Sequence, residues 1–247
     1  MHSMGALSNG DGGISGASAR EGFKAAWPIC VGYFPTGLAF GVLAQQAGIH
    51  PLAVGLMSLV VFAGSSQFIA VSMLNSGAAV MSIVLTTFVV NLRHVLMSSS
   101  LAIHLRGLSR KFLIAFAFGV TDECFAVNTT RFRLGGWRSD QAILVNYISW
   151  FAWVGSTVLG GYAGEFIPKG SFGIDYALSA LFLCLLAFQL HGSIYAVTAV
   201  IAGFLSLGLS FLISGNGYIV LASVVAATLG LILRKYFARR KTAHVEE

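Results

Sequence analysis

Residues 86–99, TTFVVNLRHVLMSS, decide how the chain can fold, because they are apolar enough to lie in a membrane and yet hold Asn91, Arg93 and His94. An arginine at the centre of a bilayer costs about 2.5–3.5 kcal/mol on scales of membrane insertion. Such a side chain needs a partner or a water-filled cavity inside the protein. We therefore expect this segment to face the interior of a helical membrane protein on one side.

The composition indicates a chain that lies almost wholly in the bilayer. Of its 247 residues, 56% are hydrophobic and 10% are charged, and the mean hydropathy is +0.81. Soluble domains carry about 25% charged residues. We expect an all-α integral membrane protein, whose net charge of +6 orients it in the bilayer and does not indicate nucleic-acid binding.

Eight segments are apolar enough to be transmembrane helices, which need about 20 residues. They are residues 27–47, 52–74, 78–101, 112–128, 143–163, 176–190, 195–213 and 218–235. The sixth and seventh are separated only by HGSI, residues 191–194, and form either two spans or one broken helix. We therefore expect seven or eight transmembrane helices.

The expected organisation is one transmembrane domain, residues 25–236, between two tails. Residues 1–24 are rich in Gly, Ser and Ala and are expected to be disordered, and residues 237–247 form a basic cytoplasmic tail. With the N-terminus in the cytoplasm, eight spans place ten Lys and Arg residues inside and four outside. This bias favours cytoplasmic termini. The basic loop at residues 104–111 opposes it, unless a helix enters and returns without crossing.

Two acidic residues in the fourth expected span offer Arg93 a partner. The loop after the third span turns near residues 105–111, with Arg93 twelve residues before it and Asp122 eleven after it. At about 1.5 Å per residue, both lie roughly 17 Å from the turn. Antiparallel helices would therefore bring Arg93 level with Asp122 or Glu123. The pair would serve transport, or it would only lock two helices together.

The third expected span also carries a polar stripe. Thr87, Asn91, His94 and Ser98 follow at intervals of four, three and four residues, which places them on one helix face. A stripe this deep should face the protein interior. His94 would then serve a functional site or be a core histidine with satisfied hydrogen bonds.

The second expected span contains FAGSSQF, residues 62–68. Gly64, Ser65, Ser66 and Gln67 are four consecutive residues that weaken a membrane helix. A broken helix exposes N–H and C=O groups that can bind a carboxylate and an ammonium group. The alternative is a kink satisfied by neighbouring helices. GYFPTG, residues 32–37, is a second candidate for a break.

A weak internal repeat supports the broken-helix interpretation. GIHPLAVGLMSLVVFAGSSQ begins at Gly48, and GIDYALSALFLCLLAFQLHGS begins at Gly173. Both segments are apolar at first and become polar about sixteen residues after the initial glycine, at residues 64–67 and 189–192. Corresponding interruptions in two halves of a chain indicate a transporter site. A chance match of two apolar segments is the alternative.

Four motifs together resemble the AzlC-type branched-chain amino acid permeases. They are PxGxxFG at residues 35–41, FAGSSQF at 62–68, NLRHxLM at 91–97 and TDExF at 121–125. The resemblance covers roughly residues 25–235, and the first half carries nearly all of the motifs. It implies export of branched-chain amino acids and a small second membrane subunit of the AzlD type.

We therefore expect a secondary active exporter of valine, leucine, isoleucine and other apolar amino acids in the bacterial inner membrane, driven by proton antiport. The chain holds no GxxxxGK stretch for ATP hydrolysis, and we expect no catalytic residue, metal or cofactor. The expected substrate-binding residues are Gly64, Ser65, Ser66, Gln67, Asn91, Arg93 and His94, and the expected proton-coupling residues are Asp122 and Glu123. A channel is the alternative, and an intramembrane hydrolase is a weaker one, since GSSQF lacks the second glycine of GxSxG.

Overall fold

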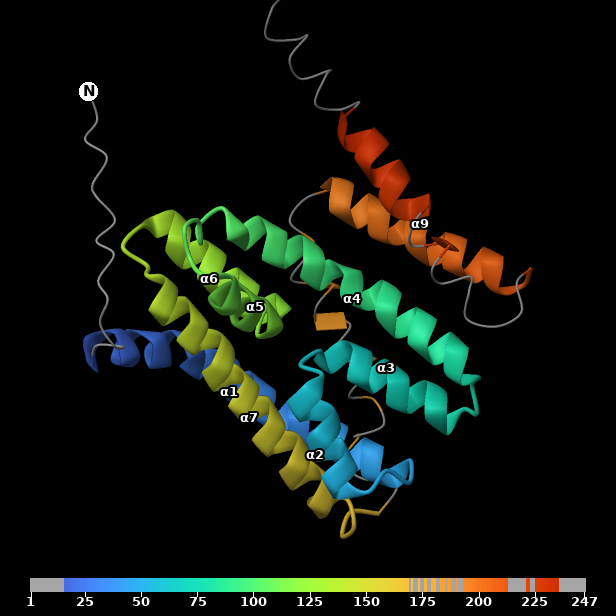
Figure 1. The fold of residues 1–247 in the computed structure, drawn as a ribbon. Helices are drawn as coiled ribbons and strands as arrows, with labels where there is room; N and C mark the ends of the chain where they lie inside the picture. The colour runs from blue at the N-terminus through green and yellow to red at the C-terminus, as the bar shows by residue number, and fades with distance from the viewer. Residues whose placement is uncertain are drawn as a thin grey trace, which may run out of the picture. The chain divides into compact units, whose positions relative to one another are not determined.

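The computed structural model describes most of the chain as helix (Figure 1). The described residues are 16–168, 170, 173, 176, 179–180, 183–184, 186–187, 190, 193–212, 221–222 and 225–235. In this part of the chain every regular element is helical, which confirms the all-α class.

Among the described residues, four helices are long and apolar enough to cross a membrane. They are α1 (Gly16–Gln46), α4 (Val80–Ala102), α7 (Ser139–Ala163) and α9 (Ser193–Ser210). They correspond to the first, third, fifth and seventh expected spans. Helix α1 already includes residues 16–24, which the sequence placed in the N-terminal tail. The sixth and eighth expected spans and the C-terminal tail fall wholly or partly outside the described residues, so the count of seven or eight stays a prediction.

The second and fourth expected spans are each divided into two helices. The second consists of α2 (Pro51–Val60) and α3 (Gly64–Asn75), and the fourth of α5 (Arg110–Phe118) and α6 (Asp122–Leu134). Three residues interrupt each one, at 61–63 and at 119–121. A long helix follows in both cases, α4 and α7. The interruption therefore recurs within the first 163 residues, whereas residues 189–192 of the expected repeat are almost all outside the described part.

Two expectations about the breaks need correction. Residues 64–67 do not form the break but the first turn of α3, which begins after it. GYFPTG, at residues 32–37, stays helical within α1 although it contains Pro35. Thr36 donates its hydroxyl hydrogen to the carbonyl oxygen of Gly32 at 2.9 Å, an additional bond in the turn that the proline weakens.

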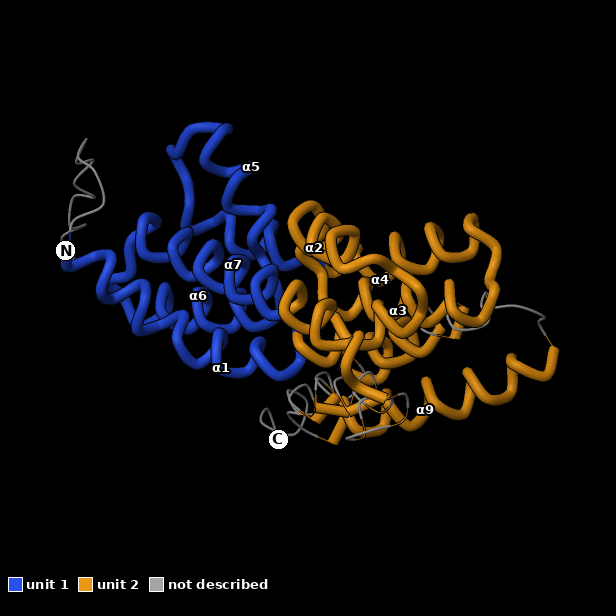
Figure 2. Tube along the Cα trace, turned by 90° about the horizontal axis from the view of Figure 1, so that it is seen from below, with its two compact units in different colours: residues 1–37, 94–156 blue, residues 38–93, 157–247 orange. Residues whose placement is uncertain are grey.

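The described residues form two compact units, shown in different colours in Figure 2. Unit 1 contains residues 1–37 and 94–156, and unit 2 contains residues 38–93 and 157–247. The divisions fall inside α1, α4 and α7, so each of these helices contributes to both units. Each unit therefore combines segments that are distant in sequence.

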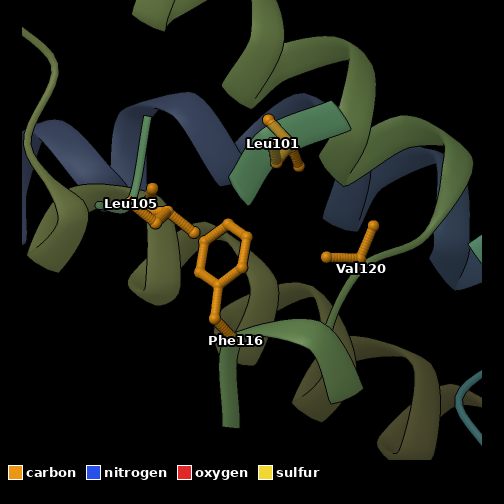
Figure 3. Packing of buried hydrophobic residues seen from close by; sticks show 5 residues of the cluster. Leu101, Leu105, Phe116 and Val120 are labelled. Atoms are coloured by element: carbon orange, nitrogen blue, oxygen red, sulfur yellow. The ribbon is translucent and has the colours of Figure 1, made fainter. Parts of the chain in front are cut away.

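The core of unit 1 surrounds the connection between α4 and α5. Its buried side chains are Leu101, Leu105, Phe116, Val120 and Ala142. The four that Figure 3 labels, all but Ala142, point toward a common centre. Val120, in the second break, is fully buried in this core. The break is thus part of the packed interior of the unit.

In unit 2, small residues let α1 and α7 approach closely. A Cβ atom added to Gly160 would lie 2.2 Å from the carbonyl oxygen of Leu38, and one added to Gly41 would lie 2.2 Å from that of Thr157. The two helices therefore touch through their backbones, as small residues permit in membrane proteins.

This packing predicts different effects for two glycines of α7. Gly160→Ala should destabilise the protein by about 1–3 kcal/mol, because its methyl group would overlap the α1 backbone. Gly155→Ala, with no atom within 4 Å of the new Cβ, should not lower stability. Thermal unfolding of the purified variants in detergent measures both. Equal unfolding midpoints for the two variants would contradict the close approach of α1 and α7.

Candidate functional site

The first break, in unit 2, leaves the start of α3 without a side-chain cap. The N–H of Val61 closes α2 by donating to the carbonyl oxygen of Met57 at 2.8 Å. Ala63 is the N-cap of α3, and its carbonyl oxygen accepts from the N–H of Gln67 at 3.0 Å. An alanine side chain cannot accept from the first-turn N–H groups, which the helix itself leaves unused. This helix start therefore keeps its positive end available.

Side chains of α4 bind the first turn of α3. Ser66 donates from Oγ to Asn91 Oδ1 at 2.5 Å, and the Arg93 guanidinium donates from Nη2 to Ser65 Oγ. Ser65 and Ser66 are buried, whereas Asn91 and Arg93 are half-buried. Four of the seven expected substrate residues thus come together within one unit.

Gln67 also lies in this first turn, but its side chain bonds elsewhere. Its Nε2 donates to Ser58 Oγ at 3.0 Å, and Thr157 Oγ1 lies 2.9 Å from the same oxygen. All three residues are fully buried. The Gln67 amide therefore links the first turn of α3 to α2 directly and to α7 through Ser58.

The second break, in unit 1, is capped. Thr121 is the N-cap of α6, and its Oγ1 accepts from the N–H of Cys124 at 3.4 Å. His94 of α4 places Nδ1 2.7 Å from the carbonyl oxygen of Val120. Because a carbonyl only accepts, this nitrogen carries the proton. His94 therefore bonds the backbone of the second break.

The two expected proton-coupling residues begin α6. Asp122 and Glu123 are half-buried and form its acidic first turn, where negative charge is stabilised by the helix dipole. Glu123 Oε2 lies 2.7 Å from the hydroxyl oxygen of Tyr33 on α1. Arg93 belongs to unit 2 and both carboxylates to unit 1. Their pairing stays a prediction.

Two buried asparagine amides also stabilise the second break. Asn146 of α7 donates from Nδ2 to the Phe116 carbonyl oxygen at the end of α5, at 3.1 Å. Its Oδ1 accepts from Asn128 of α6 at 3.0 Å, and Trp137 Nε1 donates to Asn128 Oδ1 at 3.0 Å. Both asparagines are fully buried. Gly119 permits this approach, because a Cβ there would lie 2.6 Å from Asn146 Cβ.

Sequence reasoning did not single out Tyr33, Ser58, Asn128, Asn146 or Thr157. One signal was present for the second break: a threonine followed by two acidic residues is typical of a helix start. In the part of the chain that the structure describes, no three His, Cys, Asp or Glu side chains gather as a metal site would require.

The family of the chain follows from the segment that holds both breaks. Residues 28–167 match the family described as AzlC protein. The chain belongs to the AzlC family. The matched segment contains all four motifs of the sequence analysis and every residue described above at the two breaks. The resemblance drawn from the motifs is therefore confirmed.

Relatives of this AzlC-family chain are named as membrane proteins or as a transport protein. It is 34% identical to the inner membrane protein YgaZ of Escherichia coli over 77% of this chain and 81% of the relative. It is 28% identical to the branched-chain amino acid transport protein AzlC of Bacillus subtilis, over 89% and 86% of the two chains. An uncharacterised membrane protein of Archaeoglobus fulgidus is 35% identical over 71% and 78%. No solved structure matches the chain.

The amide contacts at the second break predict a stability effect. Asn146→Leu should lower stability by about 1–3 kcal/mol, because it removes two buried hydrogen bonds, one to the Phe116 carbonyl oxygen and one from the Asn128 amide. The measurement is thermal unfolding in detergent. Tyr147→Phe is the control, since it removes one bond to the Ala115 carbonyl oxygen from a half-buried neighbour. A wild-type midpoint for Asn146→Leu would contradict the role of the amides.

Proposed function

We propose that this AzlC-family protein is a secondary active exporter of branched-chain and other apolar amino acids in the bacterial inner membrane, with both termini in the cytoplasm. The observation that carries the proposal is the interrupted α2–α3 helix, whose buried first turn meets Asn91 and Arg93 inside an apolar chain. The name of the Bacillus subtilis relative supports the substrate class. A small AzlD-type membrane subunit is the proposed partner.

The start of α3 suits the carboxylate of an amino acid. Its first turn contains no acidic residue, its N-cap offers no side-chain acceptor, and Arg93 adds a positive charge beside Ser65. A helix N-terminus with free N–H groups binds anions, and a guanidinium can bind a carboxylate through two parallel bonds. We propose that the substrate carboxylate binds here and replaces part of the Arg93–Ser65 contact.

The start of α6 suits a cation instead. Asp122 and Glu123 already compensate the positive end of that helix, so an incoming anion would meet negative charge. We propose that one of these carboxylates carries the coupled proton in exchange for the amino acid. Protonation from the acidic outer side would then accompany release of the substrate, which makes the cycle an antiport.

The apolar side chain of the substrate needs no polar partner. One methylene group in an apolar pocket changes binding by about 1–3 kcal/mol. Valine, leucine and isoleucine should therefore all be carried, and methionine should be tolerated as well.

Counterflow of labelled valine in proteoliposomes tests the proposed function. Purified protein, with and without the small subunit, should accumulate the label against preloaded unlabelled valine, and the rate should saturate. Saturation separates a carrier from a channel. Absence of counterflow in both preparations, with the protein folded, would overturn the proposal.

A substitution at Arg93 tests the carboxylate site. Arg93→Ala should lower the rate of valine counterflow at least tenfold, because the desolvated carboxylate would lose its charged partner. Arg106→Ala, in the exposed loop before α5, is the matched control and should leave counterflow unchanged. Normal folding and normal transport in Arg93→Ala would exclude Arg93 from the site and would also remove the expected charge pair with Asp122 or Glu123.

Substitutions of the two carboxylates test the coupling. Asp122→Asn or Glu123→Gln should abolish export driven by a pH gradient, while exchange of valine for valine survives. The surviving exchange follows because substrate binding at the start of α3 does not require the proton. Export with an unchanged pH dependence in both variants would show that neither carboxylate is the coupling site.

A further inference from the structure

Tyr33 of α1 reaches the start of α6 with its hydroxyl group. Its oxygen lies 2.8 Å from Thr121 Oγ1 and 2.7 Å from Glu123 Oε2. The residue is buried, with 8% of its surface exposed. A buried tyrosine usually finds a hydrogen-bond partner. Here one of the two partners can ionise, so the contact has a chemical consequence as well as a structural one.

The three side chains form a hydrogen-bond chain with a direction. An ionised carboxylate only accepts, so with Glu123 charged the Tyr33 hydroxyl donates to it and the Thr121 hydroxyl donates to Tyr33. Thr121 Oγ1 in turn accepts from the N–H of Cys124. When Glu123 takes up a proton it becomes a donor, and the chain can then run from Glu123 through Tyr33 to Thr121.

Neighbouring groups fix Tyr33 in this position. Its ring packs edge-on against Trp153 of α7, with the centroids 5.4 Å apart and an angle of 70° between the planes. Its backbone carbonyl oxygen accepts from Ser156 Oγ at 3.3 Å and from Thr36 Oγ1 at 3.3 Å. The hydroxyl is therefore held against the carboxylate by packing and by the backbone.

We propose that Tyr33 is a positioning residue that holds the Glu123 carboxylate at the start of α6 and favours its charged form. The inference rests on the proposed role of Glu123 in proton coupling. A hydrogen bond to a charged acceptor is roughly twice as strong as one between neutral groups. Removing the Tyr33 hydroxyl therefore weakens the charged state more than the protonated state. The carboxyl group then keeps its proton to a higher pH.

Other titratable groups of unit 1 lie at or beside the start of α6. Helix α6 itself contributes Asp122 and the buried thiol of Cys124, and α4 contributes His94, whose Nδ1 bonds the carbonyl one residue before Thr121. Helix α7 contributes Trp153 and Ser156, which contact Tyr33 and carry no charge. Among the described side chains of this unit, hydrogen bonds join Glu123 to Tyr33 and Tyr33 to Thr121.

The protonation of Glu123 can be measured without transport. A hydrophobic carbodiimide modifies protonated carboxyl groups, and mass spectrometry of the fragmented peptide separates Glu123 from Asp122. In the full-length wild type, labelling of Glu123 should fall as pH rises. In Tyr33→Phe the midpoint should lie about one pH unit higher, which is a tenfold change in the protonation equilibrium. Identical midpoints in the two proteins would overturn the inference.

Matched variants separate this effect from a loss of packing. Tyr147→Phe removes a tyrosine hydroxyl from the same unit and should leave the midpoint at the wild-type value. If Tyr33→Phe fails to fold, substitutions of Thr121, at the other end of the hydrogen-bonded series, test the inference. Thr121→Val should raise the midpoint, and Thr121→Ser, which keeps the hydroxyl, should not. Equal labelling midpoints for the two Thr121 variants would contradict the hydrogen-bonded series from Thr121 through Tyr33 to Glu123.

The pH profile of valine export distinguishes this inference from the proposed function. If the wild type is pH-dependent, the profile of Tyr33→Phe should move to higher pH by the same amount as the labelling midpoint. A pH-independent wild type would reject proton coupling, and labelling would still decide the role of Tyr33. A shifted labelling midpoint with an unshifted export profile would reject Glu123 as the coupled group while keeping Tyr33 as its positioning residue.

Discussion

The backbone groups that a helix releases when it breaks inside a membrane must find partners within the protein, because lipid offers none. Side chains of neighbouring helices contact both interruptions, through backbone carbonyl oxygens at the second break and through serine side chains at the first. At the first break, Asn91 and Arg93 of α4 reach the serines that begin α3. At the second, His94 and Asn146 reach the carbonyl oxygens of Val120 and Phe116.

Helix α4 contributes side chains to both breaks. Asn91, Arg93 and His94 lie within four residues of α4, and the division between the units falls between the last two. The polar residues that are costly in a membrane helix are therefore the ones that support the breaks. The NLRH motif combines a structural role with the chemistry proposed for transport, and substitutions in it will affect both.

Hydropathy and motif spacing predicted the helical class, the positions of α1, α4, α7 and α9, and an interruption near FAGSSQF. These features depend on local apolarity and on residues that weaken a helix. The side-chain contacts of Ser66 with Asn91 and of Arg93 with Ser65 join residues that the sequence placed in one substrate site, and that site stays a prediction.

The rest depends on contacts between distant residues. Tyr33 and Asn146 resemble ordinary residues of membrane helices, and only the packing of α1 and α7 against α6 shows what they bind. The second break was missed because apolarity continues across residues 119–121, although Thr121, Asp122 and Glu123 have the pattern of a helix start. The location of the first break was wrong by a few residues, since Gly64, Ser65 and Ser66 tolerate a first helical turn as well as a break.

The composition of unit 1 from two distant segments has a consequence for biosynthesis. Tyr33 and Glu123 are separated by 90 residues, which a ribosome adds in roughly 5–20 s. During that interval the α1 segment is already made, while the partners of its polar groups are not. The nascent protein must therefore pass through a state in which the Tyr33 hydroxyl is satisfied by water, by lipid headgroups or by the insertion machinery. Final assembly of the unit begins only when α6 and α7 have entered the membrane.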